Sequence, residues 1–331
     1  MQEIIINEKT SGGRMDKTVM KYLNKAASGF VYKMIRKKNI ELNGKKAKGD
    51  EILKTGDCIR LFMSDETIQK FRDSEKKERP SAQSDLLSKM IVYEDENVIA
   101  VNKPVNMLSQ KSEGNLTSIN DLLVSYLGES ELFTPGISNR LDRNTSGLIL
   151  AGKNPNSVRV LNQAIKSRSV QKLYLCIVKG YVASDSELDG YLIKNEKSNK
   201  VQILNKNKIS GKMDNASAIK TKYKVLSYTQ ETSLLQVDLI TGKPHQIRAH
   251  LASIGHPIIG DFKYGDPFIN QKFKQRYGLD HQLLHAYIIH FNEMNGILDY
   301  LNNKEIIAPL PRAFHLIIKG EKLCLHGNQE D

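Results

Sequence analysis

Apolar and polar positions in the first sixty residues follow a helical period and then a strand period. The helical period covers residues 14–26 and 29–39 and predicts two short helices. Their inward-facing apolar positions are Met15, Val19, Leu23, Phe30, Met34 and Ile35. Residues 40–63 then alternate around an Asn43-Gly44 pair, which is typical of a tight β-hairpin turn. The pattern therefore predicts a small helix-and-hairpin unit.

Beyond residue 63 the pattern divides into a polar stretch and a long region of mixed strands and helices. Residues 64–87 carry many charges and few apolar anchors, a composition typical of a linker. From residue 88 to residue 320, β-branched runs alternate with turns and helical segments, which predicts a second and larger domain. We therefore expect a small domain at 1–63, a polar linker at 64–87, the large domain at 88–320 and a C-terminal tail at 321–331.

One acidic residue, Asp142, stands in a turn-prone run directly before a strand. The run LDRNTSG precedes the apolar run LILAG, so the carboxylate is expected at a strand end and not on a solvated helix face. Nearby Arg140 and Arg143 would favour its ionised form and lower its pKa. Such a carboxylate donates protons poorly, but it can serve as a nucleophile or as a counter-charge to a cation.

Two further strands carry a polar residue that could have a function. An apolar strand at 98–101 stops at Lys103, just before a proline, and an ordinary strand end is the favoured interpretation. Residues 170–180 alternate as a strand, after a helix predicted over residues 154–168. Within this strand Tyr174 lies on the opposite face from its neighbours. A tyrosine in such a position belongs to the core more often than to a functional site.

A helix with an arginine on its flank is predicted from about residue 245 to residue 253, and a glycine closes it. Ile247, Leu251 and Ile254 are spaced to face the core. Arg248 then lies beside this apolar stripe, where it can reach a carboxylate from a neighbouring loop.

The chain is basic, and its positive charge is concentrated near the N-terminus. The 331 residues carry a formal net charge of +12, which favours an acidic partner such as nucleic acid, although basic solubility explains it as well. Residues 1–62 hold fourteen Lys and Arg against seven acidic residues, a net +7 that leaves +5 for the rest. The candidate phosphate-binding cations there are Lys33, Arg36, Lys37, Lys38, Lys45 and Lys46. From charge alone, a solvated charge run is equally favoured.

Cysteine usage and hydropathy indicate a protein of a reducing compartment. The three cysteines, which are far apart and expected to be buried thiols, are Cys58, Cys176 and Cys324. Their spacing predicts neither a disulfide framework nor a zinc site. The N-terminus lacks an export signal, and no eighteen apolar residues run together. We expect a soluble, cytoplasmic protein.

All eight histidines fall between residues 245 and 326, which raises the question of a metal. His245 and His250 are five residues apart, the wrong relation for a helical zinc pair, and no HExxH occurs. We therefore expect no metal, and interpret these two and His285 as hydrogen-bonded structural residues or phosphate contacts. A serine hydrolase is not favoured either, because Ser146 lacks a GxSxG context.

Residues 12–62 resemble the alpha-L RNA-binding domain that is shared with a small-subunit ribosomal protein. The resemblance rests on the segments RMDKTVMKYL, IRKKNIELNGKK and LKTGDCIRL in this order. It implies RNA, rather than DNA or a membrane, as the partner.

Four motifs of the large domain stand in the order found in RluA-type RNA pseudouridine synthases. They are NRLDRNTSGLIL, QKLYLCIVKG, TGKPHQIRAHLASIGHPIIGDFKYG and LLHAYIIHF, and the resemblance spans about residues 90–318. The chain departs from the family pattern at Asn139, where His is common, and at Lys243, where Arg is frequent. The resemblance implies an α+β fold with a mixed, mainly antiparallel sheet, flanking helices and a cleft across the sheet.

The family resemblance also implies roles for individual residues. Asp142 matches the catalytic aspartate that reacts at, or assists reaction at, the target uridine. Arg248 matches the arginine that pairs with this acid, and Tyr174 the tyrosine that stacks on the uracil. The RNA contacts expected in this domain are Arg140, which helps to hold out the flipped nucleotide, Arg143 and His245. Because the reaction is an isomerisation, no cofactor and no metal are implied.

Large-subunit ribosomal RNA is the expected substrate and a monomer the expected state, and transfer RNA is the alternative substrate. Two other functions stay open at this point. A non-catalytic RNA-binding or ribosome-assembly protein would need neither Asp142 nor Tyr174. A hydrolytic RNA N-glycosylase would also use an acid beside ribose, but water would capture the sugar.

Overall fold

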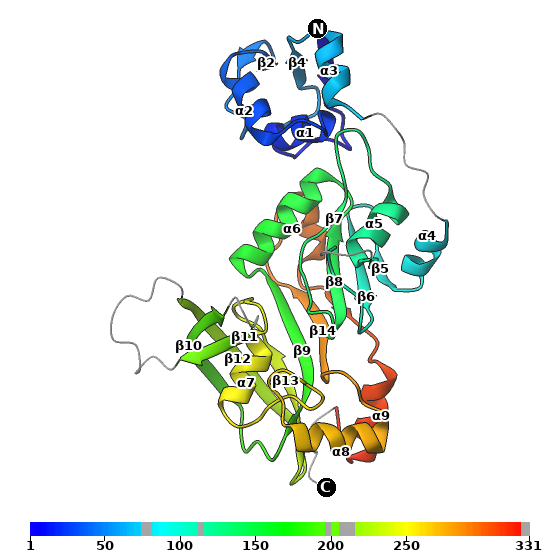
Figure 1. Ribbon diagram of the computed structural model, residues 1–331, viewed down its shortest axis with the longest axis vertical. Coiled ribbons are helices and arrows are strands. Elements are labelled where there is room, and N and C mark those ends of the chain that lie inside the picture. Colours follow the sequence, from blue (N-terminus) through cyan, green and yellow to red (C-terminus); the bar gives the residue numbers. More distant parts are fainter. Residues whose placement is uncertain (74–80, 112–115, 196–199, 205–215, 326–331) are drawn as a thin grey trace.

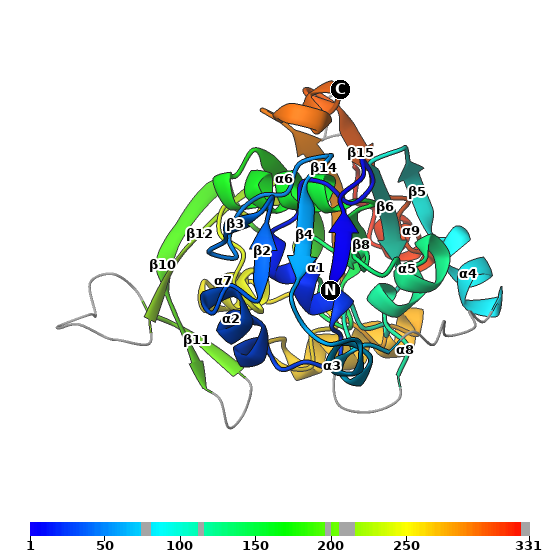
Figure 2. The same ribbon diagram turned by 90° about the horizontal axis from the view of Figure 1, so that it is seen from above.

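The N-terminal seventy residues fold around a small sheet with its own hydrophobic core. The computed structural model describes residues 1–73, 81–111, 116–195, 200–204 and 216–325. The N-terminal elements are β1 (Gln2–Ile5), α1 (Met15–Tyr22), α2 (Ser28–Arg36), β2 (Ile40–Leu42), β3 (Lys45–Lys46), β4 (Cys58–Leu61) and α3 (Asp65–Phe71). The strands pair in the order β1-β4-β2-β3, which is visible from above in Figure 2.

The hairpin and the first two helices of this unit, α1 and α2, form where the sequence pattern predicts them. Asn43 and Gly44 have φ angles of 52° and 71°, the left-handed conformation that a tight turn between β2 and β3 requires. In α2 the fully buried positions are Val31 and Ile35, whereas Phe30 is half-buried and lies against the ring of Phe71. The core-facing side of α2 is therefore centred one residue away from the predicted stripe.

The stretch expected to be a polar linker is helical at both of its ends. Ser64 caps α3, and α4 (Ser81–Ser88) follows residues 74–80, which lie outside the described residues. Each helix contributes one buried anchor: Ile68 packs into the N-terminal core and Leu87 into the core of the large sheet. The composition missed these helices because one or two packed apolar residues are enough to fix so short an element.

The rest of the chain is built on one eleven-stranded sheet. Its strands are β5 (Ile91–Glu94), β6 (Val98–Lys103), β7 (Gly136–Ile137), β8 (Ser146–Gly152), β9 (Val170–Lys179), β10 (Ser186–Asn195), β11 (Lys200–Leu204), β12 (Ala216–Tyr228), β13 (Thr232–Asp238), β14 (Leu284–Phe291) and β15 (Glu305–Ile307). They pair in the order β11-β10-β12-β13-β9-β14-β8-β6-β5, with β15 on β14 and β7 on β8. Only β14 and β8 run parallel among the described pairs, so the expected mixed, mainly antiparallel sheet is confirmed.

Helices flank this sheet. They are α4, α5 (Ile119–Leu127), α6 (Pro155–Ser167), α7 (Gln246–Ser253), α8 (Pro267–Tyr277), α9 (Arg312–Gly320) and the 3₁₀ helix η2 (Gly296–Leu301). Figure 1 shows the N-terminal unit beyond α5 and α6 at one end of the molecule, and α8 and α9 at the other end. The start of α6 follows the prediction, because the Asn154 side chain caps it and a proline occupies its first turn.

The predicted apolar stripe of α7 is wrong at its last position. Ile247 and Leu251 are buried, but Ile254 is 38% exposed. The helix ends at Ser253, and Ile254 is its C-cap residue, so its side chain no longer follows the helical stripe. Gly255 then ends the helix with a φ of 88°, as expected.

The cysteines and the C-terminal region correct two other expectations. Of the three thiols expected to be buried, only Cys176 is; Cys58 is half-buried and Cys324 is exposed. Leu323 lies in the expected tail, yet it is buried in the main core, while residues 326–331 lie outside the described residues. Across the described ranges, each helix is too short or too polar to span a bilayer.

Candidate active site

Asp142 lies in the turn before β8, and neighbouring side chains fix this turn. The Ser109 hydroxyl donates to the carbonyl of Leu141 and accepts from its N–H, at 2.8 and 2.9 Å. Asn139 bonds the main chain of β8 on both sides, since its amide donates to the Leu148 carbonyl and its oxygen accepts from the Leu150 N–H. Asn139 therefore acts as a structural clamp on the strand that follows Asp142.

Asp142 is held by Arg248, and Arg248 is held by a second carboxylate. The Arg248 Nη1 donates to Asp142 Oδ2 at 2.8 Å, while its Nε and Nη2 donate to the two oxygens of Asp261 at 2.7 and 2.9 Å. The Asp142 side chain is 29% exposed, that of Arg248 is 9% exposed, and that of Asp261 is fully buried. The contact that the sequence predicted between Arg248 and a loop carboxylate is present.

Burial opposes the charges of Arg248 and Asp261, and the pairing between them overcomes it. Burial by itself lowers the pKa of Arg248, but hydrogen bonds and charges from Asp261 and Asp142 raise that pKa above its usual range. Burial likewise acts to raise the pKa of Asp261, and the Arg248 guanidinium holds that pKa below its ordinary value. The buried pair Arg248–Asp261 therefore stays charged and presents a fixed cation to Asp142.

Tyr174 and His245 complete the surroundings of Asp142. Tyr174 on β9 is 5% exposed, and its burial, together with the charge of Asp142, raises the pKa of its phenol. His245 Nδ1 lies 2.9 Å from the Tyr264 hydroxyl, and its Nε2 is 3.9 Å from Asp142 Oδ2. Burial lowers the pKa of His245, so its ring is favoured in the neutral form. His245 thus lines the site beside Asp142.

Two residues of this site escaped the sequence analysis. Lys103 was interpreted as an ordinary strand end, but it is fully buried, and its ammonium donates to the carbonyls of Pro104, Met107 and Arg143 at 2.9, 2.9 and 3.0 Å. Burial lowers its pKa to about 7, against a raising effect of Asp142. A lysine closing an apolar strand was the available signal. Asp261 gave no signal beyond its place in the motif GDFKYG.

The arginines next to Asp142 in the sequence do not pair with it. Arg140 and Arg143 are exposed, and the Arg143 Nε lies 3.4 Å from the carbonyl of Asn106. The guanidinium at Asp142 comes instead from Arg248 on α7. The expectation that the two sequence neighbours supply this charge is wrong, because the turn directs their side chains outward.

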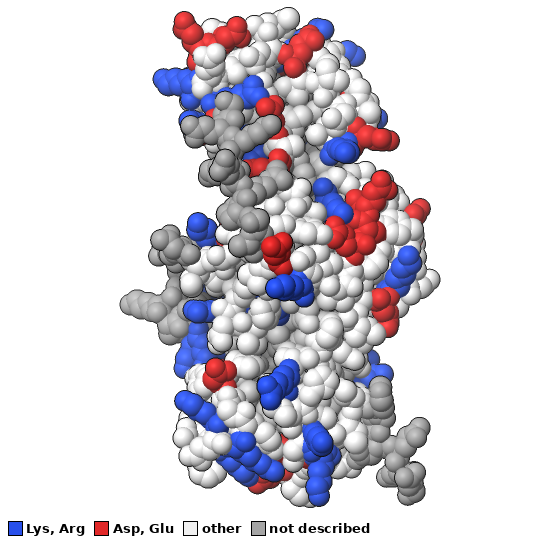
Figure 3. All heavy atoms as spheres, turned by 90° about the vertical axis from the view of Figure 1, so that its right-hand side faces the viewer, with Lys and Arg blue, Asp and Glu red and all other residues white. Residues whose placement is uncertain are grey.

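The cations predicted to bind phosphate in the N-terminal unit are all exposed. They are Lys33, Arg36, Lys37, Lys38, Lys45 and Lys46, and none of them forms an ion pair with a residue that the structure describes. Figure 3 shows the side of the molecule that lies to the right in Figure 1. There, basic (blue) and acidic (red) side chains are mixed over the upper half, and basic ones prevail in the lower half.

Two buried histidines outside this site, His250 and His285, form structural hydrogen bonds. His250 Nδ1 lies 3.0 Å from the Thr221 hydroxyl, and His285 Nδ1 lies 2.8 Å from the Ser146 hydroxyl. Burial lowers the pKa of each ring to about 4, so both are neutral. In the described part of the chain, no three His, Cys, Asp or Glu side chains gather as metal ligands would.

Comparison with known proteins finds relatives over nearly the whole chain. Residues 97–253 match the family model described as RNA pseudouridylate synthase. A Vibrio parahaemolyticus protein, "Ribosomal large subunit pseudouridine synthase C", is 30% identical over 97% of this chain and 96% of its own length. An "Uncharacterized RNA pseudouridine synthase" of Mycoplasma capricolum is 31% identical over 93% of this chain and 97% of its own.

Among solved structures, "Human RNA Pseudouridylate Synthase Domain Containing 4" aligns with a TM-score of 0.61 at 22% identity, over 74% of this chain and 98% of that one, and so shares the fold. The chain belongs to the RNA pseudouridylate synthase family. It is an RNA pseudouridine synthase of the RluA type, and RNA is its substrate.

Proposed function

We propose that this enzyme isomerises uridine in large-subunit ribosomal RNA, with Asp142 as its catalytic residue. The observation that carries the proposal is that Arg248 pairs with two carboxylates, of which one is buried and the other is partly exposed to solvent. Asp261 is fully buried and cannot touch a nucleotide, whereas Asp142 is partly exposed beside the Tyr174 ring. Asp142 is therefore the acid that can meet a substrate while it stays paired with Arg248.

The reaction needs the uridine outside its helix. Extruding a base costs a few kcal/mol, and stacking on an aromatic ring returns about 1 to 3 kcal/mol. Tyr174 supplies such a ring, and exposed Arg140 is available to occupy the place of the extruded nucleotide. The stacking free energy on Tyr174 and the arginine side chain together offset the free-energy cost of extruding the base.

The bond changes balance within the nucleotide. The bond from ribose C1′ to uracil N1 breaks, the base rotates, and a bond from C1′ to C5 forms. The proton on C5 leaves and N1 gains one, so the product is an isomer of the substrate. Asp142, as a held carboxylate, adds to or stabilises the electron-poor sugar or base during the exchange. A Tyr174 phenol with a raised pKa stays protonated, and it serves mainly as the stacking surface.

Two observations support ribosomal RNA as the substrate. Several relatives that align over most of the chain, such as the Vibrio parahaemolyticus protein, carry the name of large-subunit ribosomal enzymes. The N-terminal unit, proposed here as an alpha-L RNA-binding domain at residues 1–63, offers six exposed cations for phosphates. Transfer RNA is the competing substrate, and both RNAs belong in the assay.

The test is tritium release from RNA labelled at uridine C5. The wild-type enzyme is expected to release tritium from large-subunit ribosomal RNA and to leave the RNA strand intact. Asp142→Asn is expected to abolish release and to leave RNA binding nearly unchanged, while the matched surface variant Asp280→Asn behaves as wild type. Release by Asp142→Asn at the wild-type rate would refute the role of Asp142. Release from transfer RNA alone would refute the ribosomal substrate, and free uracil would indicate an N-glycosylase.

A further inference from the structure

One cation of the site region, Lys172, has no partner among the residues that the structure describes. Lys172 precedes Tyr174 by two positions on β9, so both side chains lie on the same face of the strand, about 7 Å apart along it. Its ammonium has no hydrogen bond or ion pair with any residue that the structure describes. The side chain is nevertheless half-buried, and burial lowers its pKa.

The position of the Lys172 ammonium is defined by the loop that leads to α7. A Cβ built at Gly242 would lie 3.8 Å from the Lys172 Nζ, so the ammonium rests against this loop. The loop continues through exposed Lys243 to His245, whose ring is 3.9 Å from Asp142. Lys172 therefore lies between the ring proposed to stack the uracil and the loop that borders the catalytic acid.

Two cations near Asp142, Arg248 and Lys103, are already engaged. Arg248 donates to Asp142 and Asp261, and Lys103 donates to three main-chain carbonyls. A half-buried charge without a partner costs folding free energy. Such a charge fits a site whose anion arrives with the substrate.

We infer that Lys172 binds a phosphate of the RNA backbone beside the target uridine and so positions the extruded nucleotide. The inference rests on the proposed function, because it takes Tyr174 as the place of the uracil. A phosphate is the anion that RNA brings to this position, and the distance along the strand from Tyr174 suits the separation between a base and the phosphate of its own nucleotide. Lys172 is a binding residue in this assignment and takes no part in the bond exchange.

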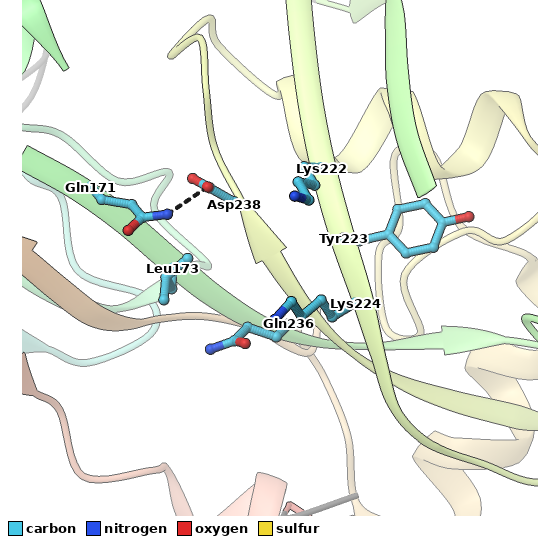
Figure 4. A pocket seen from close by; sticks show the side chains of 7 residues that line it. All are labelled: Gln171, Leu173, Lys222, Tyr223, Lys224, Gln236 and Asp238. Carbon is cyan, nitrogen blue, oxygen red and sulfur yellow. Dashed lines mark hydrogen bonds between the residues drawn. The ribbon is translucent and has the colours of Figure 1, made fainter. Parts of the chain in front are cut away.

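The opposite face of the same sheet region supplies a matched control. A pocket of about 230 Å³ opens there between β9, β12 and β13, lined among others by Gln171, Leu173 and exposed Lys222. Figure 4 shows Gln171 hydrogen-bonded to Asp238 in this pocket, with the Tyr223 ring directed away from the other lining side chains. Lys222 thus belongs to the same sheet as Tyr174 but lies on its opposite face, because it shares a face with Leu173.

The experiment compares Lys172→Met, Lys172→Arg and Lys222→Met with wild type, using tritium release from large-subunit ribosomal RNA at several salt concentrations. Lys172→Met is expected to raise KM about ten-fold with little change in kcat, the effect of losing one charge-assisted hydrogen bond. The slope of log KM against log salt concentration is expected to fall by about 0.7 to 0.9, which is one phosphate contact. Lys172→Arg should keep most of the wild-type affinity, and Lys222→Met should have the wild-type KM and salt slope.

Two further readouts separate binding from structure. The wild-type KM is expected to rise with alkaline pH as the Lys172 ammonium loses its proton, and this rise should vanish in Lys172→Met. Because Met removes an unpaired charge, the Tm of Lys172→Met should equal or exceed that of wild type. A lower Tm, or KM and salt slope equal to those of wild type, would overturn the inference.

Binding without turnover keeps this inference distinct from the proposed catalytic role. Filter binding of the same RNA to Asp142→Asn, with and without Lys172→Met, is expected to show the same ten-fold loss. If Asp142→Asn still releases tritium, the catalytic assignment fails while the binding comparison still decides the role of Lys172. Equal affinities in the two binding measurements would contradict the phosphate contact.

Discussion

Replacing Asp261 by asparagine tests whether a buried carboxylate holds the catalytic pair in place. Asp261 accepts two hydrogen bonds from Arg248 and two from the main-chain N–H groups of Lys263 and Tyr264. Asparagine keeps the side-chain volume and one accepting oxygen. Its NH2 group, however, is a donor and would face one of the two N–H donors of Arg248. The substitution also removes a negative charge from a fully buried ion pair.

The magnitude follows from that loss. Breaking a buried ion pair costs about 3 to 5 kcal/mol, and Asp142 remains as a partial partner for Arg248, so about 3 kcal/mol is expected. At about 2 to 4 °C per kcal/mol for a domain of this size, the Tm should fall by roughly 6 to 12 °C. Since a small misplacement of a reacting group costs up to about 10²-fold in rate, kcat should fall well below wild type.

The assays are thermal unfolding and tritium release, with RNA binding as the third measurement. RNA affinity should stay close to wild type, because Asp261 is buried away from the surface. Asp280→Asn removes an exposed carboxylate that pairs with His281, and it should change Tm and kcat little. If Asp261→Asn matches this control in both Tm and kcat, Arg248 does not need its second carboxylate, and the positioning argument is wrong.

Three further predictions concern the ring, the histidines and the N-terminal cations. Tyr174→Phe should keep RNA affinity, because the stacking surface remains, whereas Tyr174→Leu should weaken binding by about 1 to 3 kcal/mol in a filter assay. The depressed pKa values of His250 and His285, about 4 in the fold, mean that only the unfolded state takes up protons at those positions as pH falls from 6.5; stability should therefore be complete above pH 6.5 and decline toward pH 4. Denaturant titrations at several pH values measure this, and His250→Asn should flatten the decline. Replacing Lys37 and Lys38 together by Gln should weaken RNA binding and lower its salt slope by about 0.7 to 0.9 per lost phosphate contact; unchanged affinity would leave the solvated charge run as the better interpretation.

Local pattern was informative wherever neighbours in the chain decide the structure. The Asn43-Gly44 turn and the Asn154 cap each depend on the conformational preference of one or two residues. The pattern was less accurate at the end of α7, where Ile254 leaves the stripe because the helix stops one residue earlier. It also gave the wrong source for the cation at Asp142, because adjacency in sequence does not fix where side chains in a turn point.

The sequence by itself determined the family, the position of Asp142 at a strand end, and the arginine on the flank of the helix that pairs with it. These features are encoded in short motifs, and the order of the motifs along the chain can be recognised without knowing any distance in space. Only the tertiary structure decided that Asp261 and Lys103 bond to other groups of the protein, whereas Lys172 has no such bond to a residue in the described ranges. Burial and pairing depend on which distant segments the sheet brings together, and the sequence alone does not distinguish a lysine that donates to three carbonyls from one that does not.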